Sequence, residues 1–376
     1  MKVTAGLLVD FGNSESRVTV LANKKEKEMF FSNVFAKLPK NYGIASSYQN
    51  DKSTVIELNG ENYVNGLLAE REFSKTPIRP TSLRQKNVQE TTKLTLNLAM
   101  ARAIMYLEEA YNTDASELEV TFNVSVVIPP LECKTSIEKM EAVIREIDHV
   151  HIMLPKHLKK TVTIKDVRIN PEGVTAFFGA FFNEVEDELV EEEKNLDFES
   201  GYVLVMDIGA GTTDLALMLD SLLVENSMET FRVGGNTVGS TIENLIRLNY
   251  NNHTPTTKEM VKIITTGYMP YGNRTINVID LINSAKKDYA RDMIEKLTKY
   301  LERLSIDIGS LKGLLVVGGG SLPIKTETGE VLSPAMAELI LEFLNELNSM
   351  TEAMYIGDKN PRLLNMLGLK FMHKYE

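Results

Sequence analysis

Short apolar runs alternate along the chain with longer segments in which apolar residues recur at helical spacing. Two runs, residues 3–21 and 203–217, each hold two apolar strands joined by Asp-x-Gly and small hydroxyl-bearing residues, which predicts a β-hairpin. Further strands are predicted at residues 28–35, 53–64, 119–128, 161–170 and 314–317. Helices are predicted at residues 88–111, 132–146, 171–189, 240–249, 281–304, 334–348 and 360–373. This alternation predicts an α/β fold, and the hairpins make its sheets mixed rather than purely parallel.

The two hairpins repeat one pattern that suits phosphate binding. Glycines let the backbone turn and let a ligand approach closely, successive N–H groups form an anion-binding concavity, and hydroxyls add donors. The candidate phosphate-binding residues are Asp10, Gly12, Asn13 and Ser14 in the first hairpin and Asp207, Gly209, Ala210, Gly211, Thr212, Thr213 and Asp214 in the second. The alternative is an ordinary tight turn. The first hairpin fits that alternative better than the second.

The two hairpins also imply a metal ion. Asp10 and Asp207 stand where their strands end, and carboxylates repel phosphate unless a cation lies between them. Mg²⁺ prefers oxygen ligands and keeps several of its waters, so both residues are predicted to hold Mg²⁺ through water. Neither hairpin is a Walker A loop, because no G-x-x-x-x-G-K-S/T occurs, and the second leads into a strand rather than the helix of a dinucleotide fingerprint.

Two glycine-rich junctions follow the second hairpin. Gly318, Gly319, Gly320 and Ser321 come directly after an apolar strand, where glycines allow a flat ring or a phosphate to approach. Gly234, Gly235 and Asn236 precede a predicted helix and are weaker evidence. A flexible loop and a tight turn are the respective alternatives.

Glu172 has two interpretations. It lies at the start of the predicted helix 171–189, where a carboxylate stabilises the helix dipole. It is also placed to accept a hydrogen bond from a water that attacks a γ-phosphate. The sequence by itself does not choose between the two roles.

Composition narrows the function classes. The chain has 376 residues, a net charge of −11 and 43% hydrophobic residues, which predicts a globular protein of two domains or one large bilobed unit. Strong negative charge argues against direct binding of nucleic acid. Cys133 is the only cysteine, so disulfides and cysteine-based metal sites are excluded and a cytoplasmic location is expected. No signal peptide or membrane span is predicted, and the acidic run 184–199 predicts a solvated helix tail and loop.

These elements in this order resemble the superfamily of actin, heat-shock-chaperone ATPases and sugar kinases. The superfamily has five nucleotide-site motifs, and the matching segments are residues 10–17, 172–179, 207–214, 318–321 and 360–368. The resemblance implies a two-lobed fold with a nucleotide in the cleft between the lobes. Lobe I would span residues 1–171, with an insertion at about 30–90, and be completed by a helix at about 350–376. Lobe II would span residues 172–349, with an insertion at about 238–300.

The resemblance also assigns roles to residues. Asp10 and Asp207 would hold Mg²⁺, the turns of both hairpins would bind phosphates, and Gly234, Gly235, Gly318 and Gly319 would line the nucleoside. Glu172 would position the hydrolytic water. ATP is the expected nucleotide, and GTP is the alternative, because the base pocket is defined only by a glycine-rich strand end.

Within the superfamily the chain looks most like the ParM-type bacterial actins that segregate plasmids. The segments that carry this likeness are Asp-Phe-Gly-Asn-Ser at 10–14 and Pro-Glu-Gly at 171–173. The resemblance implies self-assembly into ATP-dependent filaments and a DNA-binding adaptor on a centromere-like plasmid site, with no membrane partner. A metabolic kinase or phosphatase of the same fold and a non-filamentous regulatory ATPase are the alternatives. A chaperone would carry a further peptide-binding domain, which we do not expect here.

Overall fold

The chain forms two compact units. The computed structural model describes residues 1–12, 15–39, 53–71, 73, 77–80, 85–114, 117–155, 157–185, 188–191, 201–325, 329–346, 352–354 and 360–375. Unit 1 comprises Met1–Gly179 and Asn365–Glu376, and unit 2 comprises Ala180–Leu364. The chain passes from unit 1 to unit 2 after Gly179 and returns to unit 1 after Leu364, whereas the sequence placed these boundaries after residue 171 and near residue 350.

Unit 1 is built on a mixed sheet whose described strands follow the order β3-β2-β1-β7-β9-β8-β5-β6-β4. The strands are β1 (Lys2–Phe11), β2 (Glu15–Ala22), β3 (Lys25–Ser32), β4 (Phe35–Lys37), β5 (Ser53–Leu58), β6 (Glu61–Gly66), β7 (Glu119–Ile128), β8 (His149–Leu154) and β9 (Leu158–Pro171). The predicted first hairpin is confirmed as the antiparallel pair β1–β2. Strand β7 runs parallel to both β1 and β9, so the carboxyl ends of these three strands share one edge of the sheet.

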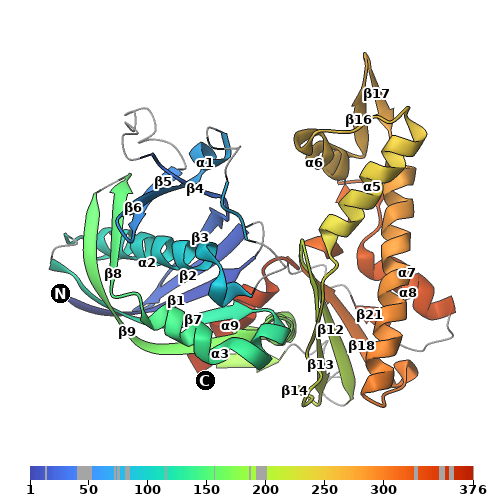
Figure 1. Ribbon diagram of the computed structural model, residues 1–376. Coiled ribbons are helices and arrows are strands. Elements are labelled where there is room, and N and C mark those ends of the chain that lie inside the picture. Colours follow the sequence, from blue (N-terminus) through green and yellow to red (C-terminus); the bar gives the residue numbers. More distant parts are fainter. Residues whose placement is uncertain are drawn as a thin grey trace. The chain divides into compact units, whose positions relative to one another are not determined.

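Helices cover the sheet of unit 1 (Figure 1). They are α1 (Leu67–Arg71), α2 (Glu90–Tyr111), α3 (Pro130–Arg145), α4 (Val174–Phe181) and α9 (Leu364–Tyr375), with the 3₁₀ turn η2 (Lys86–Val88) before α2. The predicted helix 88–111 is confirmed as α2, whose Leu94, Leu98 and Leu107 are fully buried. Apolar residues at this spacing form one stripe, and burial of that stripe holds the helix on the sheet.

Helices α4 and α9 make a close backbone contact within unit 1. A Cβ atom added to Gly368 of α9 would lie 1.7 Å from the carbonyl oxygen of Thr175 in α4. Only glycine fits such an approach, which accounts for Gly368 in the last of the five sequence motifs.

Unit 2 repeats the arrangement of unit 1. Its main sheet has the order β14-β13-β12-β18-β21, and β15 also pairs with β13. These strands are β12 (Tyr202–Ile208), β13 (Thr213–Leu219), β14 (Leu222–Leu223), β15 (Glu229–Phe231), β18 (Leu311–Val317) and β21 (Glu352–Met354). The predicted second hairpin is confirmed as the antiparallel pair β12–β13, and β12 runs parallel to β18 as β1 does to β7.

The helices of unit 2 are α5 (Gly235–Asn249), α6 (Thr257–Thr266), α7 (Ile279–Arg303) and α8 (Met336–Glu346). Helices α7 and α8 pack on the main sheet through one apolar core that includes Met206, Met293 and Ile340. At one end of α7 a smaller core joins α5, α6 and the hairpin of β16 (Tyr268–Tyr271) and β17 (Arg274–Asn277) (Figure 1). Short elements complete the unit: β10 (Phe182–Val185), β11 (Glu188–Glu191), β19 (Ile324–Lys325), β20 (Val331–Ser333), η5 (Ile308–Ser310) and η6 (Gly319–Ser321).

The predicted helix 171–189 is wrong over most of its length. Pro171 is the last residue of β9 rather than part of a first helical turn, and helix α4 spans only Val174–Phe181. The chain then forms the antiparallel hairpin β10–β11 instead of an acidic helix tail. Side-chain exposure alternates along β10, as it does in a strand, but apolar and acidic residues do not alternate in this segment, so its sequence gave no strand signal to set against its charge. Residues 192–200 of the acidic run lie outside the described residues.

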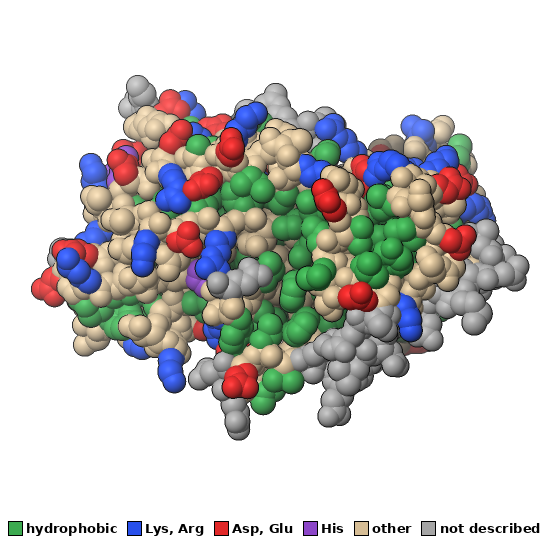
Figure 2. Space-filling model, turned by 90° about the horizontal axis from the view of Figure 1, so that it is seen from below, with side chains coloured by type: hydrophobic (Ala, Val, Ile, Leu, Met, Phe, Trp, Pro, Cys, Tyr) green, Lys and Arg blue, Asp and Glu red, His purple; other side chains and the backbone are tan. Residues whose placement is uncertain are grey.

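The surface carries both signs of charge despite the net charge of −11. On the face shown in Figure 2, Lys and Arg side chains lie among Asp and Glu side chains. Among the described residues, no helix is both long enough and apolar enough to cross a membrane.

His373 of α9 is buried against the sheet of unit 1. Its Nδ1 atom lies 2.7 Å from Ser125 Oγ, and its ring lies against the backbone of Gly6. Burial lowers the pKa of His373 below its ordinary value of 6.5, Arg168 lowers it further, and Asp166 opposes both. The fold therefore favours the neutral imidazole, and the stability that this gives is present above the unfolded pKa and is lost as the pH falls.

We expect the free energy of unfolding to decrease as the pH is lowered from 7.5 to 5.5, with His373 contributing at most about 1.4 kcal/mol per pH unit. His373→Gln should flatten this dependence, because glutamine cannot acquire the proton. His149→Gln is the matched control, since its side chain is 65% exposed, and it should keep the wild-type dependence. Urea unfolding across the pH range measures both. Equal slopes for the wild type and His373→Gln would contradict the assignment.

Candidate functional site

The second hairpin places Asp207 at the carboxyl end of β12. In the β12–β13 ladder Asp207 pairs with Asp214 and Ile208 with Thr213, and residues 209–212 form the connecting turn. The N–H of Gly209 donates to the Thr212 carbonyl over 2.9 Å, which closes the turn. Asp207 is only 6% exposed, so its carboxylate is held in a largely desolvated position.

Hydrogen bonds of buried side chains hold this turn in shape. Asp214 is fully buried, and its carboxylate accepts hydrogen bonds from Thr212 Oγ1 at 3.0 Å and Thr230 Oγ1 at 2.6 Å. The hydroxyl of Thr213 donates to the Val233 carbonyl at 2.8 Å and lies 2.6 Å from the hydroxyl of Tyr289 in α7. Thr213 and Asp214, which the sequence marked as phosphate-binding, thus direct their side chains into the protein. The role that this geometry supports for them is to hold the turn in shape.

The N-terminus of α5 is joined to the same turn. The N–H groups of Gly235 and Asn236 donate to the carbonyls of Gly209 and Ala210 at 2.9 and 2.8 Å. A Cβ atom on Gly234 would lie 2.7 Å from the Gly209 carbonyl oxygen, so this close approach requires glycine. Helix α5 begins at Gly235 and not at 240 as predicted, because these bonds satisfy N–H groups that a helix otherwise leaves without partners. The positive end of the α5 dipole therefore lies beside the turn.

The Gly318–Ser321 segment packs directly on Asp207. Val317 at the end of β18 pairs with Asp207, so Gly318 follows next to the carboxylate. Gly318 has a φ of +84°, and a Cβ atom on it would lie 2.2 Å from Asp207 Oδ1. Its N–H donates to the Pro361 carbonyl at 3.2 Å, and the buried Ser321 hydroxyl donates to its carbonyl at 2.8 Å. A Cβ atom on Gly320 would in turn meet the side chain of Ile208.

A buried lysine that the sequence analysis did not single out contacts the backbone just after this segment. Lys286 of α7 donates through Nζ to the carbonyls of Leu322, at 3.4 Å, and Pro334. Burial lowers the pKa of Lys286 to about 8, and the nearby Glu338 charge opposes the shift. The available signal was its spacing: Lys286 lies four residues after Ile282 and seven before Met293, on the apolar face of the predicted helix.

In unit 1, Asp10 occupies the position that corresponds to Asp207. It lies at the end of β1, pairs with Arg17 across the hairpin and is 9% exposed. Burial raises the pKa of Asp10 above its usual range, while the charges of Arg17 and the buried Lys86 oppose that rise. Lys86 is a second cation that sequence reasoning missed. Asn13 and Ser14, both predicted to bind phosphate, lie outside the described residues.

Glu172 lies at the same edge of the unit 1 sheet as Asp10. Asp10 pairs with Val127 of β7, and Val127 pairs with Asn170 of β9, so Asp10 and Asn170 are level and about 10 Å apart across two strand spacings. Glu172 comes two residues later, and its N–H donates to the Ile128 carbonyl at 2.9 Å. Its carboxylate therefore belongs to a strand end rather than to the first turn of a long helix.

The junction after Glu172 is fixed by α9. Gly173 has a φ of +82°, and its N–H donates to Asn365 Oδ1 at 3.3 Å. The same oxygen accepts the Thr175 hydroxyl at 2.7 Å. Asn365 thus determines where β9 ends and α4 begins.

The predicted site residues therefore gather in two clusters, one in each unit. The Asp10 cluster in unit 1 contains Asp10, Gly12 and Glu172. The Asp207 cluster in unit 2 contains residues 207–214, 234–236 and 318–321. In both clusters an aspartate ends the first strand of a hairpin whose neighbour is a parallel strand.

Comparison with known proteins identifies this architecture. The family model described as archaeal actin homologue MreB-like, C-terminal, matches residues 205–330, a segment that includes the Asp207 cluster. The solved structure of Ta0583, an archaeal actin homolog, superimposes with a TM-score of 0.69 at 16% identity and covers 98% of both chains. The chain has the fold of the actin homologues. A search of curated protein sequences finds no match to it.

Two ParM structures share this actin-homologue fold. Bacillus thuringiensis ParM with ATP superimposes with a TM-score of 0.62 at 19% identity, covering 99% of this chain and 98% of that one. A 15-stranded ParM filament from Clostridium botulinum gives a TM-score of 0.64 at 13% identity and covers 99% of both chains. The resemblance to the actin superfamily that the five sequence segments predicted is confirmed at the level of the fold.

The close approach of Gly318 to the Asp207 carboxylate can be tested by substitution of Gly318. Gly318→Ala introduces a methyl group against the carboxylate at a positive φ, and we expect it to lower the free energy of unfolding by about 1–3 kcal/mol. It should also displace Asp207 and, on the function proposed below, weaken binding of Mg²⁺-nucleotide. Gly319→Ala is the matched control, because its Cβ atom would meet Arg362 Nε only at 3.5 Å. Urea unfolding and nucleotide titration compare the two variants, and equal behaviour would show that the contact does not constrain the site.

Proposed function

We propose that this actin homologue binds ATP with Mg²⁺, hydrolyses it and assembles into filaments in the cytoplasm. The observation that carries the proposal is the Asp207 cluster. A buried carboxylate, a turn braced by Asp214 and Thr213, a helix N-terminus and a glycine strand end converge there. Polyphosphate needs backbone donors and positive potential at a place that a ligand can approach closely. The cluster combines these features.

The residues present suit Mg²⁺. Asp10 and Asp207 offer hard carboxylate oxygens at strand ends, and Mg²⁺ is bound in such sites by one or two carboxylates while it keeps several waters. Within the part of the chain that the structure describes, no group of three or more His, Cys, Asp or Glu side chains forms a denser metal cage. Bound Mg²⁺ would neutralise charge on the phosphates. Asp10 and Asp207 would orient its waters.

The remaining roles follow the chemistry of phosphoryl transfer, which depends on positioning and electrostatic stabilisation. The turn of each hairpin would hold phosphates, and the Gly318–Ser321 segment would lie against the nucleoside. Glu172 would orient the attacking water from the edge of the unit 1 sheet. Lys86 and Lys286 would add positive charge behind the two clusters. ATP is the nucleotide we favour, with GTP as the alternative to be tested.

Filament assembly is proposed from the likeness to ParM, which extends over nearly the whole chain. By the same likeness the filament would segregate plasmid DNA through a DNA-binding adaptor that holds a centromere-like site. The net charge of −11 supports contact with DNA through such an adaptor and not directly. A ParM-type assignment therefore predicts that the protein alone does not shift DNA in a gel.

Assembly is the first test of the proposal. At micromolar concentration the protein should scatter light and pellet when ATP and Mg²⁺ are added, and the signal should decay as ATP is hydrolysed. Omission of Mg²⁺ or replacement of ATP by ADP should abolish or shorten the signal. A protein that stays monomeric under these conditions would refute the filament. A phosphorylated small-molecule product without polymer would identify a metabolic kinase instead.

Glu172 gives a second test. Loss of a group that orients or deprotonates an attacking water typically lowers the rate by ~10²–10⁴. Glu172→Ala should therefore assemble with ATP but turn over slowly, so that its filaments persist. Glu138→Ala is the control, because this glutamate is exposed on α3 and belongs to neither cluster. Phosphate release and light scattering give the two readouts, and unchanged turnover would reduce Glu172 to a structural residue of its junction.

A further inference from the structure

A buried asparagine outside every sequence motif contacts the first hairpin. Asn33 lies between β3 and β4 and is 3% exposed. Its Nδ2 group donates to the Gly12 carbonyl, and its Oδ1 atom accepts the hydroxyls of Ser16 at 2.9 Å and Thr95 at 3.2 Å. Gly12 and Ser16 flank the turn between β1 and β2, and Thr95 belongs to α2. One side chain thus joins both ends of the turn to a helix.

This set of contacts fixes the orientation of the amide. With Oδ1 against the two hydroxyls, Nδ2 must face the Gly12 carbonyl, and the reverse orientation would oppose two carbonyl oxygens. The bond determines where the Gly12 carbonyl points. Gly12 is already confined, since a Cβ atom on it would lie 2.3 Å from the Glu15 carbonyl oxygen.

A second buried asparagine holds the chain around Asn33. Asn65 of β6 is 4% exposed, and its Nδ2 group donates to the carbonyls of Ser32 and Val34, the two neighbours of Asn33. Asn65 itself is fixed in the sheet, where it pairs with Phe35 of β4 and Thr54 of β5. The position of Asn33 therefore depends on the strands β4, β5 and β6.

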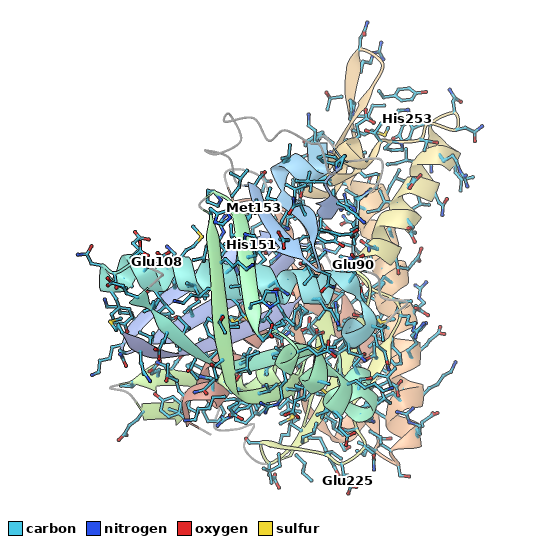
Figure 3. The ribbon with its side chains drawn as sticks, turned by 60° about the vertical axis from the view of Figure 1, so that its left-hand side comes forward. Glu90, Glu108, His151, Met153, Glu225 and His253 are labelled. Atoms are coloured by element: carbon cyan, nitrogen blue, oxygen red, sulfur yellow. The ribbon has the colours of Figure 1, made fainter. Side chains whose placement is uncertain are left out.

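Helix α2 is tied to the same strands. The hydroxyl of Tyr63 in β6 donates to Glu90 Oε1 at 2.8 Å. Figure 3 shows Glu90 at the start of α2 and Glu108 near its far end. Thr95, one and a half turns further along α2, contacts Asn33. Hydrogen bonds from β6 thus hold both α2 and the chain around Asn33.

We propose that Asn33 is the positioning residue of the first phosphate turn and that Asn65 sets the position of Asn33. The proposal rests on the proposed binding of ATP. Asn33 does not touch the nucleotide. Its bond to the Gly12 carbonyl holds the start of the turn in one orientation, so that the backbone need not be ordered when phosphate binds. A Gly12 carbonyl released from this bond is free to rotate toward a bound phosphate, and the repulsion between the two oxygens would cost binding free energy.

Asn33→Asp tests the proposal with a nearly isosteric change. The carboxylate still accepts from Ser16 and Thr95, but it sets an anionic oxygen against the Gly12 carbonyl. We expect the dissociation constant for Mg²⁺-ATP, measured by calorimetric titration of the folded protein, to rise about tenfold or more, because small displacements of positioned groups have large effects. Asn33→Ala, which removes the bond without adding charge, is the second variant and should raise it less.

Asn97→Asp is the matched control. Asn97 is also buried, at 4% exposure, and its Nδ2 group donates to the Lys93 carbonyl within α2, away from the turn. It should lose stability in urea as Asn33→Asp does but bind Mg²⁺-ATP within about twofold of the wild type. Asn65→Ala should raise the dissociation constant several-fold, and an unchanged value would refute its role.

The outcomes separate the two proposals. If the wild type binds Mg²⁺-ATP and both Asn33 variants bind it equally well, Asn33 is only structural and the inference is overturned. The same holds if Asn97→Asp weakens binding as much as Asn33→Asp does. If the wild type itself binds no nucleotide, the proposed function fails, and the positioning role fails with it.

Discussion

The parallel pairing of β12 with β18 is the constraint on which the site of unit 2 depends. It sets Val317 beside Asp207, and the chain must then turn at Gly318 with a φ of +84° directly against the carboxylate. Because a side chain at residue 318 would fill that space, the strand end can only be glycine. The buried carboxylate, the turn of the hairpin and the N-terminus of α5 are arranged around this contact. The geometry of the cluster therefore depends on one strand register.

The sequence predicted the parts of this architecture that are local. Hairpins β1–β2 and β12–β13, helix α2 and strand β7 follow from periods of two and 3.6 residues within a few turns of chain. The acidic residues after α4 suggested a solvated helix tail, but β10 and β11 pair there, and no period in this segment had indicated strands. Lys86, Lys286 and Asn33 were missed because each acquires its role from residues distant in sequence. No local pattern records such contacts.

The two hairpins differ in how their turns are held. The second is braced largely from within its motif, since Asp214 accepts from Thr212 and Thr213 bonds to Val233 a short distance along the chain. The first is braced by Asn33, which comes from the next strand connection and is itself held by Asn65. A turn that is held by residues of its own motif can be recognised from a contiguous sequence pattern. A turn that is held by residues elsewhere in the chain cannot.

This difference explains why the sequence pattern was more diagnostic of a phosphate-binding turn in the second hairpin than in the first. The turn of β12–β13 cannot change without breaking contacts inside unit 2, where Thr213 and Tyr289 are buried against α7. The turn of β1–β2 follows Asn33, and Asn33 follows β4, β5 and β6 through Asn65 and Tyr63. The first turn is therefore held by residues of β4, β5 and β6, and the second by residues of its own motif and of α7.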